Sequence, residues 1–458
     1  MPQDNERLLG EKPIFRLLMK MAVPTMLSMF IQSMYNIVDS IFVTRLGQQA
    51  FNAVTLVYPL QNLVLAVAVG LGVGLNSCIS RSLGAGRRDE ADSYAAHGFM
   101  LSFIHCALFL VLGLFGTKPF LKLFTDDPAV LEYGVSYGKI VLCLACFSLV
   151  HIAVEKLFQA TGNTMFPMLM QALGAIVNII FDPLLIYGVG VFPEMGVTGA
   201  AVATVLGQAC ACVVSLVWFF AKGNGLKVGF RGFRFRKKEV GRIYAVAVPS
   251  ALMMAMPSAL VGILNTVLGR VSELSVNFFG IYYKLQTLIY VPASGLVQGM
   301  RPIVGYNHGA KLYGRMDKCV RLSLLVVGGF ILAGTLLFEL FPRLILALFS
   351  ADNEMMEIGV PGLRILASGF LVSTFGVILP GAFEALGMGV RSLAITLVRQ
   401  LILIPPLAIA LLPAMGLAGV WLAFPVSECA AAALALALYA QFKKKRGAAQ
   451  PPISANAS

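Results

Sequence analysis

The sequence predicts an all-α polytopic membrane protein with twelve transmembrane helices, and three observations support this fold class. Of the 458 residues, 58% are hydrophobic and only 12% are charged, whereas a soluble protein carries about 25% charged residues. Apolar runs of roughly 20 residues recur along the chain, and each can cross a hydrocarbon core of about 30 Å. Because backbone groups in lipid must be hydrogen-bonded within their own segment, and because the runs lack the alternation of barrel strands, we expect them to be helices.

The expected spans and the basic connections between them define a topology. The spans cover about residues 17–43, 50–77, 94–117, 131–156, 164–189, 197–221, 243–268, 275–301, 320–342, 358–382, 391–411 and 416–441. Lysines and arginines gather in alternate connections, most densely in KGNGLKVGFRGFRFRKKEVGR (222–242). The positive-inside rule therefore predicts that both termini are cytoplasmic. The net charge of +13 follows from this topology, and it favours contact with anionic lipid headgroups over nucleic-acid binding.

The two halves of the chain are related by a shift of 225 residues. This shift places Ala22–Pro24 on Ala247–Pro249 and places Gly70, Gly74 and Gly84 on Gly295, Gly299 and Gly309. We therefore expect a first six-helix half at 1–221, a basic cytoplasmic linker at 222–242, a second six-helix half at 243–442 and a cytoplasmic tail at 443–458. Because six is even, both halves enter the membrane from the same side, as parallel repeats with a site between or within them. Such an architecture suits alternating access.

The first expected helix carries a carboxylate, at Asp39, within the stretch QSMYNIVDSIFV (32–43). A charge inside a span costs several kcal/mol unless it is paired, hydrated or protonated, so it indicates a functional site. Gln32, Tyr35, Asn36 and Asp39 are spaced i, i+3, i+4 and i+7 and therefore share one face of the helix.

The fifth and sixth expected helices repeat this theme. Gln171, Asn178 and Asp182 lie on one face of the fifth helix, and Thr204 lies about 10 Å inside the sixth, with Gln208 one turn further on. Asp39 and Asp182 are expected at similar depth, and two carboxylates in one low-dielectric pocket cannot both stay ionised without a cation. The sequence therefore predicts a site that takes up a proton or holds Na⁺, with oxygens from Tyr35, Asn178 and Thr204. The structural alternative is a polar patch that only holds helices together.

The other intramembrane polar residues are weaker candidates. Lys284 and Gln286, in the eighth helix, could face a substrate cavity, as could Gln32, Asn36, Gln171 and Gln208. Arg399 and Glu428, at similar depth on consecutive helices, are expected to form a structural pair. His151 and Glu155 lack an evident third zinc ligand. The chain has no Walker A loop, so we expect neither a resident cofactor nor its own ATPase, and no metal beyond a possible Na⁺ at Asp39 and Asp182.

These motifs resemble those of the multidrug and toxic compound extrusion (MATE) family. The matching pieces are Pro24, QSMYNIVDSIFVTRLG (32–47), RSLGAG (81–86), QATGNT (159–164), NIIFDPLLIYG (178–188) and GVTGAAVATVLGQ (196–208). In the second half, YYKLQ (282–286) and GLVQGMRPIVGYNHGA (295–310) look like the DinF-like and MepA-like bacterial branch.

The resemblance implies an antiporter of the bacterial plasma membrane that exports organic cations and drugs in exchange for H⁺ or Na⁺. It also implies two pseudo-symmetric six-helix lobes that form a V-shaped central cavity. In relatives of this branch a cluster in the N-lobe binds the coupling cation, and its matching positions here are Tyr35, Asp39, Asn178, Asp182 and Thr204. The NorM-like branch uses acids of helices 7 and 10, where this chain has only Asn265 and the terminally placed Glu384, so coupling is expected in the first half.

Other functions remain open on the sequence alone. A flippase of lipid-linked precursors, in the related superfamily, would also have two repeats, but it should line its cavity with several lysines or arginines. A membrane enzyme would need a nucleophile or metal cluster at one membrane surface, and a channel would not need rocking repeats. We expect small-molecule substrates, lipid contacts and a monomer.

Overall fold

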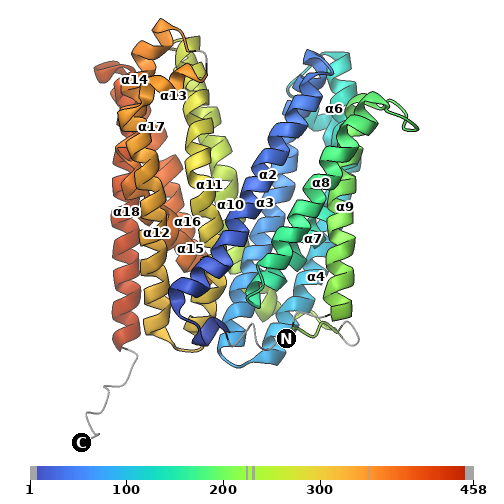
Figure 1. Ribbon diagram of the computed structural model, residues 1–458, viewed down its shortest axis with the longest axis vertical. Helices are drawn as coiled ribbons and strands as arrows, with labels where there is room; N and C mark the ends of the chain where they lie inside the picture. Colours follow the sequence, from blue (N-terminus) through green and yellow to red (C-terminus); the bar gives the residue numbers. More distant parts are fainter. Residues whose placement is uncertain (1–7, 223–224, 230–232, 350, 449–458) are drawn as a thin grey trace, which may run out of the picture. The chain divides into compact units, whose positions relative to one another are not determined.

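The computed structural model describes residues 8–222, 225–229, 233–349 and 351–448, and within these ranges every regular element is a helix. Parts of the expected linker (223–224 and 230–232) and most of the expected tail (449–458) lie outside the described residues. The helices are drawn in Figure 1. In the first half they are α2 Ile14–Thr44, α3 Gln48–Gly84, α4 Arg88–Val111, η1 Leu112–Gly116, α5 Thr117–Leu121, α6 Pro128–Cys143, α7 Cys146–Ala160, α8 Met165–Tyr187 and α9 Gly196–Lys222. In the second half they are α10 Lys237–Gly269, α11 Glu273–Gly309, α12 Tyr313–Leu340, α13 Pro342–Ala347, α14 Asn353–Ala367, α15 Phe370–Ala385, α16 Gly389–Leu397, η2 Val398–Ile402, α17 Ile404–Met415 and α18 Leu417–Ala448.

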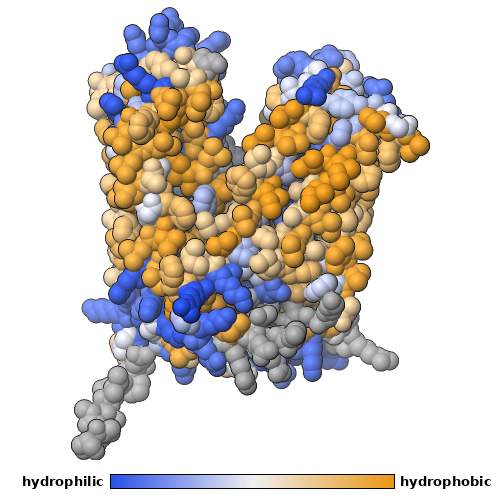
Figure 2. Space-filling model, viewed as in Figure 1, coloured by the Kyte–Doolittle hydropathy of each residue, from blue (hydrophilic) through white to orange (hydrophobic). Residues whose placement is uncertain are grey.

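The helices are long and apolar enough to confirm an all-α membrane protein. Within the described ranges, nine are able to cross a membrane by length and composition, and two further spans arise if α6–α7 and α14–α15 are each counted as one bent segment. The expected span at 275–301 falls within α11, which is not among these because polar residues such as Lys284 lower its hydropathy. Figure 2 shows hydrophobic side chains over the middle of the helices and hydrophilic ones at their ends, as lipid requires.

Local sequence explains where several helices start, stop and bend. Asp127 caps α6 by accepting the backbone N–H groups of Ala129 and Val130, and Pro128 occupies the first turn, where its missing N–H is harmless. Gly188 ends α8 with φ 68°, a left-handed conformation that favours glycine. Sharp bends of 42° and 49° separate α6 from α7 and α14 from α15. The two breaks fall at related positions of the two halves and contain no proline.

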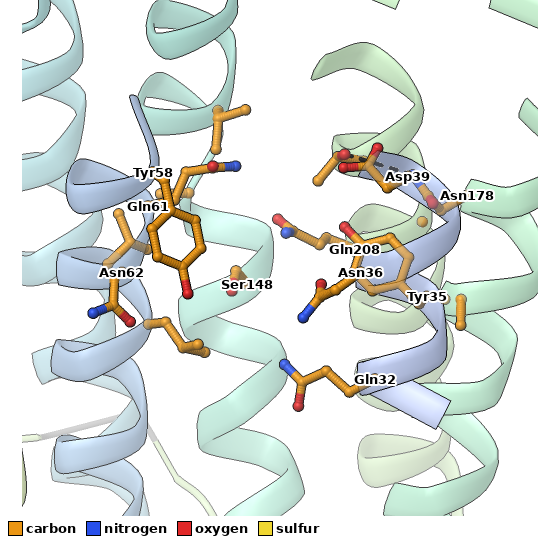
Figure 3. Close-up of a pocket in the computed structure, with 18 of the residues that line it drawn as sticks. Gln32, Tyr35, Asn36, Asp39, Tyr58, Gln61, Asn62, Ser148, Asn178 and Gln208 are labelled. Atoms are coloured by element: carbon orange, nitrogen blue, oxygen red, sulfur yellow. Dashed lines mark hydrogen bonds between the residues drawn. The ribbon is translucent and has the colours of Figure 1, made fainter. Parts of the chain in front are cut away.

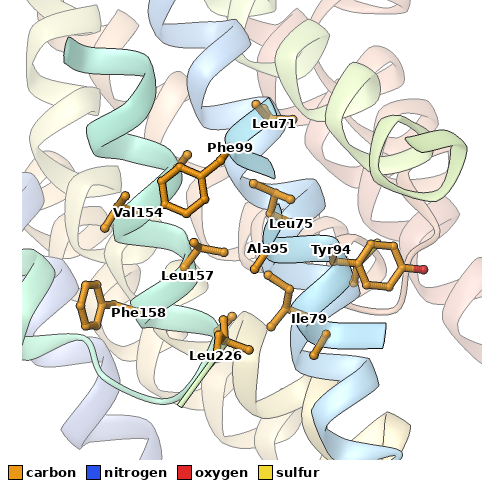
Figure 4. Close-up of a cluster of buried hydrophobic side chains, with 14 of the residues drawn as sticks. Leu71, Leu75, Ile79, Tyr94, Ala95, Phe99, Val154, Leu157, Phe158 and Leu226 are labelled. Carbon is orange, nitrogen blue, oxygen red and sulfur yellow. The ribbon is translucent and has the colours of Figure 1, made fainter. Parts of the chain in front are cut away.

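The chain folds into two compact units that do not coincide with the halves of the sequence. One unit comprises Met1–Ala255, Tyr290–Ser323 and Gly381–Val390, and the other comprises Met256–Ile289, Leu324–Pro380 and Arg391–Ser458. The first unit therefore holds the whole first half together with one end of several second-half helices. One of its apolar clusters joins α3, α4 and α7, and includes Leu75, Phe99 and Leu157 (Figure 4).

Glycines related by the repeat bring the two halves into backbone contact inside the first unit. A Cβ atom at Gly74 would lie 3.3 Å from the backbone nitrogen of Ala247, and one at Gly299 would lie 2.7 Å from that of Ala22. The repeat shift converts one of these contacts into the other. We call this contact of α2, α3 and α7 with residues 243–255, 290–309 and 381–390 of the second half the inter-half seam. Small residues allow such close helix approach in membranes.

Adding a methyl group at the seam should therefore destabilise the protein. We expect Gly299→Ala to cost roughly 1–3 kcal/mol, because the new Cβ meets backbone that cannot move aside. The matched control is Gly280→Ala, also in a helix interior, where a Cβ has no neighbour within 4 Å; there alanine should be neutral or stabilising by about 0.5–1 kcal/mol. Apparent melting temperatures in detergent test this, and equal shifts for the two variants would contradict the seam packing.

The second unit buries the ion pair expected from the sequence. The Nε atom of Arg399 donates to both carboxylate oxygens of Glu428, at 2.8 and 2.9 Å. Arg399 lies in the π-helix η2, where the Ser427 hydroxyl donates to its carbonyl oxygen at 2.6 Å. Gly376 leaves room for the pair, since a Cβ there would come within 3.3 Å of the Arg399 side chain.

Candidate cation and substrate site

A cavity of about 470 Å³ opens within the first unit, between α2, α3, α6, α7, α8 and α9. Figure 3 shows its polar side chains on two facing walls, one from α2, α8 and α9 and one from α3 and α7. The first wall carries most of the residues that the sequence singled out: Gln32, Tyr35, Asn36, Asp39, Gln171, Asn178, Thr204 and Gln208. The i, i+3, i+4, i+7 spacing on α2 therefore does place one polar face toward a cavity.

The two intramembrane aspartates belong to one buried polar cluster. The Nδ2 atom of Asn178 donates to Asp182 Oδ1 at 3.3 Å and contacts the Thr204 hydroxyl at 3.5 Å. Asp182 is 0% exposed and lies behind the cavity wall, whereas Asp39 lines the cavity itself. Tyr35 reaches the same cluster through a hydrogen bond with Thr204. The carboxyl groups of Asp39 and Asp182 are close enough to interact electrostatically.

Several oxygens of this cluster are buried without a hydrogen bond to any described residue. They are Asp39 Oδ1, Asn178 Oδ1 and Asp182 Oδ2. Buried acceptors are normally satisfied, because an unpaired one costs about 1–3 kcal/mol. Oxygens from carboxylate, amide and hydroxyl groups are hard ligands that suit a proton or an alkali cation. The geometry can therefore accept a small positive charge at this place.

The weaker sequence candidates separate into two groups. Gln32, Asn36, Gln171 and Gln208 lie on the cavity wall, with Gln32, Asn36 and Gln208 directed into the open space in Figure 3. Lys284 and Gln286 instead lie on α11 in the second unit, where Lys284 is exposed, and neither lines this cavity.

Sequence reasoning missed the opposite wall. Gln61 donates through Nε2 to the hydroxyl of Tyr137 at 3.1 Å, and Tyr58 and Asn62 flank it on α3. His151, considered from the sequence only as a zinc ligand, lines the same cavity and contacts the Ser215 hydroxyl at 3.2 Å. Tyr58, Gln61 and Asn62 are spaced i, i+3 and i+4 on α3, so the helical spacing used for α2 could have found them. Tyr137 and His151 are single polar residues on separate helices and show no spacing pattern.

The helical membrane fold and the internal polar cavity are typical of a membrane transporter. A family model, MatE, matches the chain twice, over residues 24–184 and 249–410. The chain therefore belongs to the MatE family of transporters. This confirms the resemblance found in its motifs.

Relatives and solved structures match over nearly the full length. The chain is 26% identical to a FAD transporter of Shewanella oneidensis, over 91% of this chain and 92% of the relative. It is 25% identical to the multidrug export protein MepA of Staphylococcus aureus, over 93% of each. A multidrug resistance MATE family transporter solved in an outward-facing conformation superposes with a TM-score of 0.89 at 26% identity, covering 96% of this chain and 97% of that one. A MOP superfamily transporter from Pyrococcus furiosus gives a TM-score of 0.88 at 25% identity, with 96% and 97% coverage.

Proposed function

We propose that this protein is a secondary active efflux antiporter that exports organic cations and drugs in exchange for H⁺ or Na⁺, by alternating access of its two halves. The observation that carries the proposal is the set of buried, unsatisfied oxygens on Asp39, Asn178 and Asp182 beside the cavity. A coupling ion bound there would satisfy these acceptors. Its release would restore the negative charge, and such a change can bias helix packing between two states.

The lining of the cavity favours positively charged or neutral substrates. The described residues around it include carboxylate, amide, phenol and hydroxyl groups but neither lysine nor arginine. A flippase moving a phosphorylated headgroup, or a carrier of a phosphate-bearing dinucleotide such as the FAD of the Shewanella oneidensis relative, would be expected to present cations to those phosphates. A cavity without lysine or arginine agrees better with drug export, the activity in the name of the Staphylococcus aureus relative, than with transport of a phosphorylated anion.

The proposal includes an orientation and an assembly state. One end of the first unit carries the exposed side chains of Arg87, Arg236 and Arg242, which pair with Glu90 and Glu239. We assign this end to the cytoplasm, where anionic lipids attract basic residues. We assign transport to a single chain, since the cavity and the cluster are both built from one unit.

The test is efflux of a fluorescent organic cation from proteoliposomes under separately imposed pH and Na⁺ gradients. We expect the cation to move against its own gradient when one of the two ions flows the opposite way, and the active gradient identifies the coupling ion. Protein-free liposomes are the control. Absence of cation movement under both gradients, with transport of a phosphorylated anion such as FAD instead, would reject the proposal.

A further inference from the structure

Lys156 is a buried charged residue that neither the cation cluster nor the substrate cavity uses. It is 4% exposed and lies near the end of α7, on a helix that otherwise packs into the apolar core. Its aliphatic stem covers Gly72 of α3, where a Cβ would come within 2.5 Å of Lys156 Cγ. A buried ammonium group requires nearby acceptors, because leaving it unpaired in the interior is strongly unfavourable.

Three oxygens surround the ammonium group, and they come from both halves of the chain. Lys156 Nζ donates to Glu155 Oε1 at 2.9 Å and to Gln159 Oε1 at 3.1 Å, both on α7. It also donates to Gln298 Oε1 at 2.8 Å, on α11 of the second half. All four residues belong to the first compact unit. The bond to Gln298 therefore crosses the inter-half seam.

A second network with the same design lies on the other half. The Glu384 carboxylate pairs with Arg301 Nη2 at 2.6 Å and accepts the Ser250 hydroxyl at 2.5 Å. It is joined to the first half through its backbone, since the Ser77 hydroxyl donates to the Glu384 carbonyl oxygen at 2.6 Å. The repeat shift places Gln159 on Glu384, so the two networks occupy related positions.

Each network balances its charge within its own half and crosses the seam only through a neutral acceptor. Lys156 keeps Glu155, and Arg301 keeps Glu384, whichever way the halves move. When the seam parts, both ion pairs therefore stay intact and become exposed to water. An uncompensated buried charge, which is the costly result of breaking an ion pair, does not arise. The remaining contacts include glycines against backbone, as at Gly299, and one further hydrogen bond to a neutral acceptor, from the Thr25 hydroxyl to the Gly295 carbonyl oxygen at 2.7 Å. The seam is thus built to open and close again.

From this geometry we propose that the Lys156–Gln298 hydrogen bond is the latch of the inner gate, holding the seam shut while the cavity faces outward. Opening toward the cytoplasm breaks this bond and lets water take the place of Gln298 on the ammonium group. The inference rests on the alternating access of the proposed function. It assigns Lys156 and Gln298 a positioning role, not contact with substrate.

The seam offers a position for an accessibility reporter. Ser80 is 0% exposed and faces Gly305 of α11, where a Cβ would come within 2.2 Å of the Ser80 hydroxyl. The reporter variant is Ser80→Cys in full-length protein in lipid, and its reaction rate with a maleimide is read by fragment-resolved mass spectrometry. That readout separates it from the native Cys78, which is also buried.

We expect Gln298→Leu to raise the labelling rate of the reporter roughly tenfold, the effect of losing a charge-assisted hydrogen bond from the closed state alone. The matched control is Gln159→Leu, which removes an acceptor of the same ammonium group that both states retain, and it should leave the rate near that of the parent. Gln298→Glu should have the opposite effect on the labelling rate. A carboxylate facing Lys156 strengthens the closed state, so the reporter should react more slowly than in the parent protein.

The outcomes separate the latch from the proposed function. Labelling that rises equally in both leucine variants, or that does not respond to Gln298→Leu and Gln298→Glu, overturns the latch even if the parent transports cations. Labelling that follows the expected order in a protein that moves no cation supports the latch and rejects the transport proposal instead.

Discussion

Replacing either Asp39 or Asp182 with asparagine is expected to reduce coupled efflux to the background of protein-free liposomes. Asparagine keeps the size of the side chain and one acceptor oxygen but cannot change charge, so uptake and release of the coupling ion would no longer alter the cluster. Folding should survive, because each change removes a buried acidic group with an unsatisfied oxygen rather than a packed apolar one. Fluorescent-cation efflux and size-exclusion profiles of the purified variants measure the two effects.

A carboxylate outside the cluster provides the control for this experiment. Asp126 is exposed in the connection between α5 and α6, and Asp126→Asn should transport like the parent. If Asp39→Asn or Asp182→Asn retains normal gradient-driven efflux, that aspartate does not couple transport, and the cluster serves only to hold helices together.

Removing one partner of the Arg399–Glu428 pair should give the largest loss of stability. Glu428→Leu removes the carboxylate from a guanidinium group whose side chain is only 13% exposed, and breaking a buried pair costs about 3–5 kcal/mol. Trp421, 1% exposed on the same helix and packed against Phe278, reports unfolding of this region through its fluorescence. We expect the apparent melting temperature of Glu428→Leu, measured by tryptophan fluorescence, to fall markedly below that of the parent protein.

The double variant Arg399→Met/Glu428→Leu distinguishes a missing partner from lost packing. Because apolar residues of similar volume often replace a buried ion pair at little cost, the double variant should recover most of the lost stability. A double variant as unstable as Glu428→Leu would show that the pair contributes through the shape of the π-helix rather than through charge compensation.

Much of this fold could be predicted without coordinates, because lipid imposes simple constraints. The length and hydropathy of the apolar runs were enough to predict that they are helices, since a polar backbone must be hydrogen-bonded within each span. The polar face of α2 was visible in the spacing of Gln32, Asn36 and Asp39, because helical periodicity determines which side chains share a side. The internal repeat singled out the glycines that recur in both halves, although it could not show which residues they contact.

The site could be predicted only in part, for a physical reason. Asp39, Asn178 and Asp182 stand out because a charge or amide inside an apolar run is costly and therefore informative. Gln61, Tyr137 and His151 complete the cavity from separate helices, and no local pattern connects them. Lys156 sits near a helix end, where a lysine in sequence resembles an ordinary interfacial residue.

The sequence by itself determined that this chain is a membrane protein of two related helical halves, that it carries the motifs of one transporter family, and that acids lie inside its first half. These properties depend on composition, periodicity and order along the chain. Only the tertiary structure decided that Asp39 and Asp182 share one cluster with unsatisfied oxygens, and that Lys156 binds an oxygen 142 residues away. Such relations depend on how helices pack against each other, and side-chain contacts between distant segments leave no periodic trace in a single sequence.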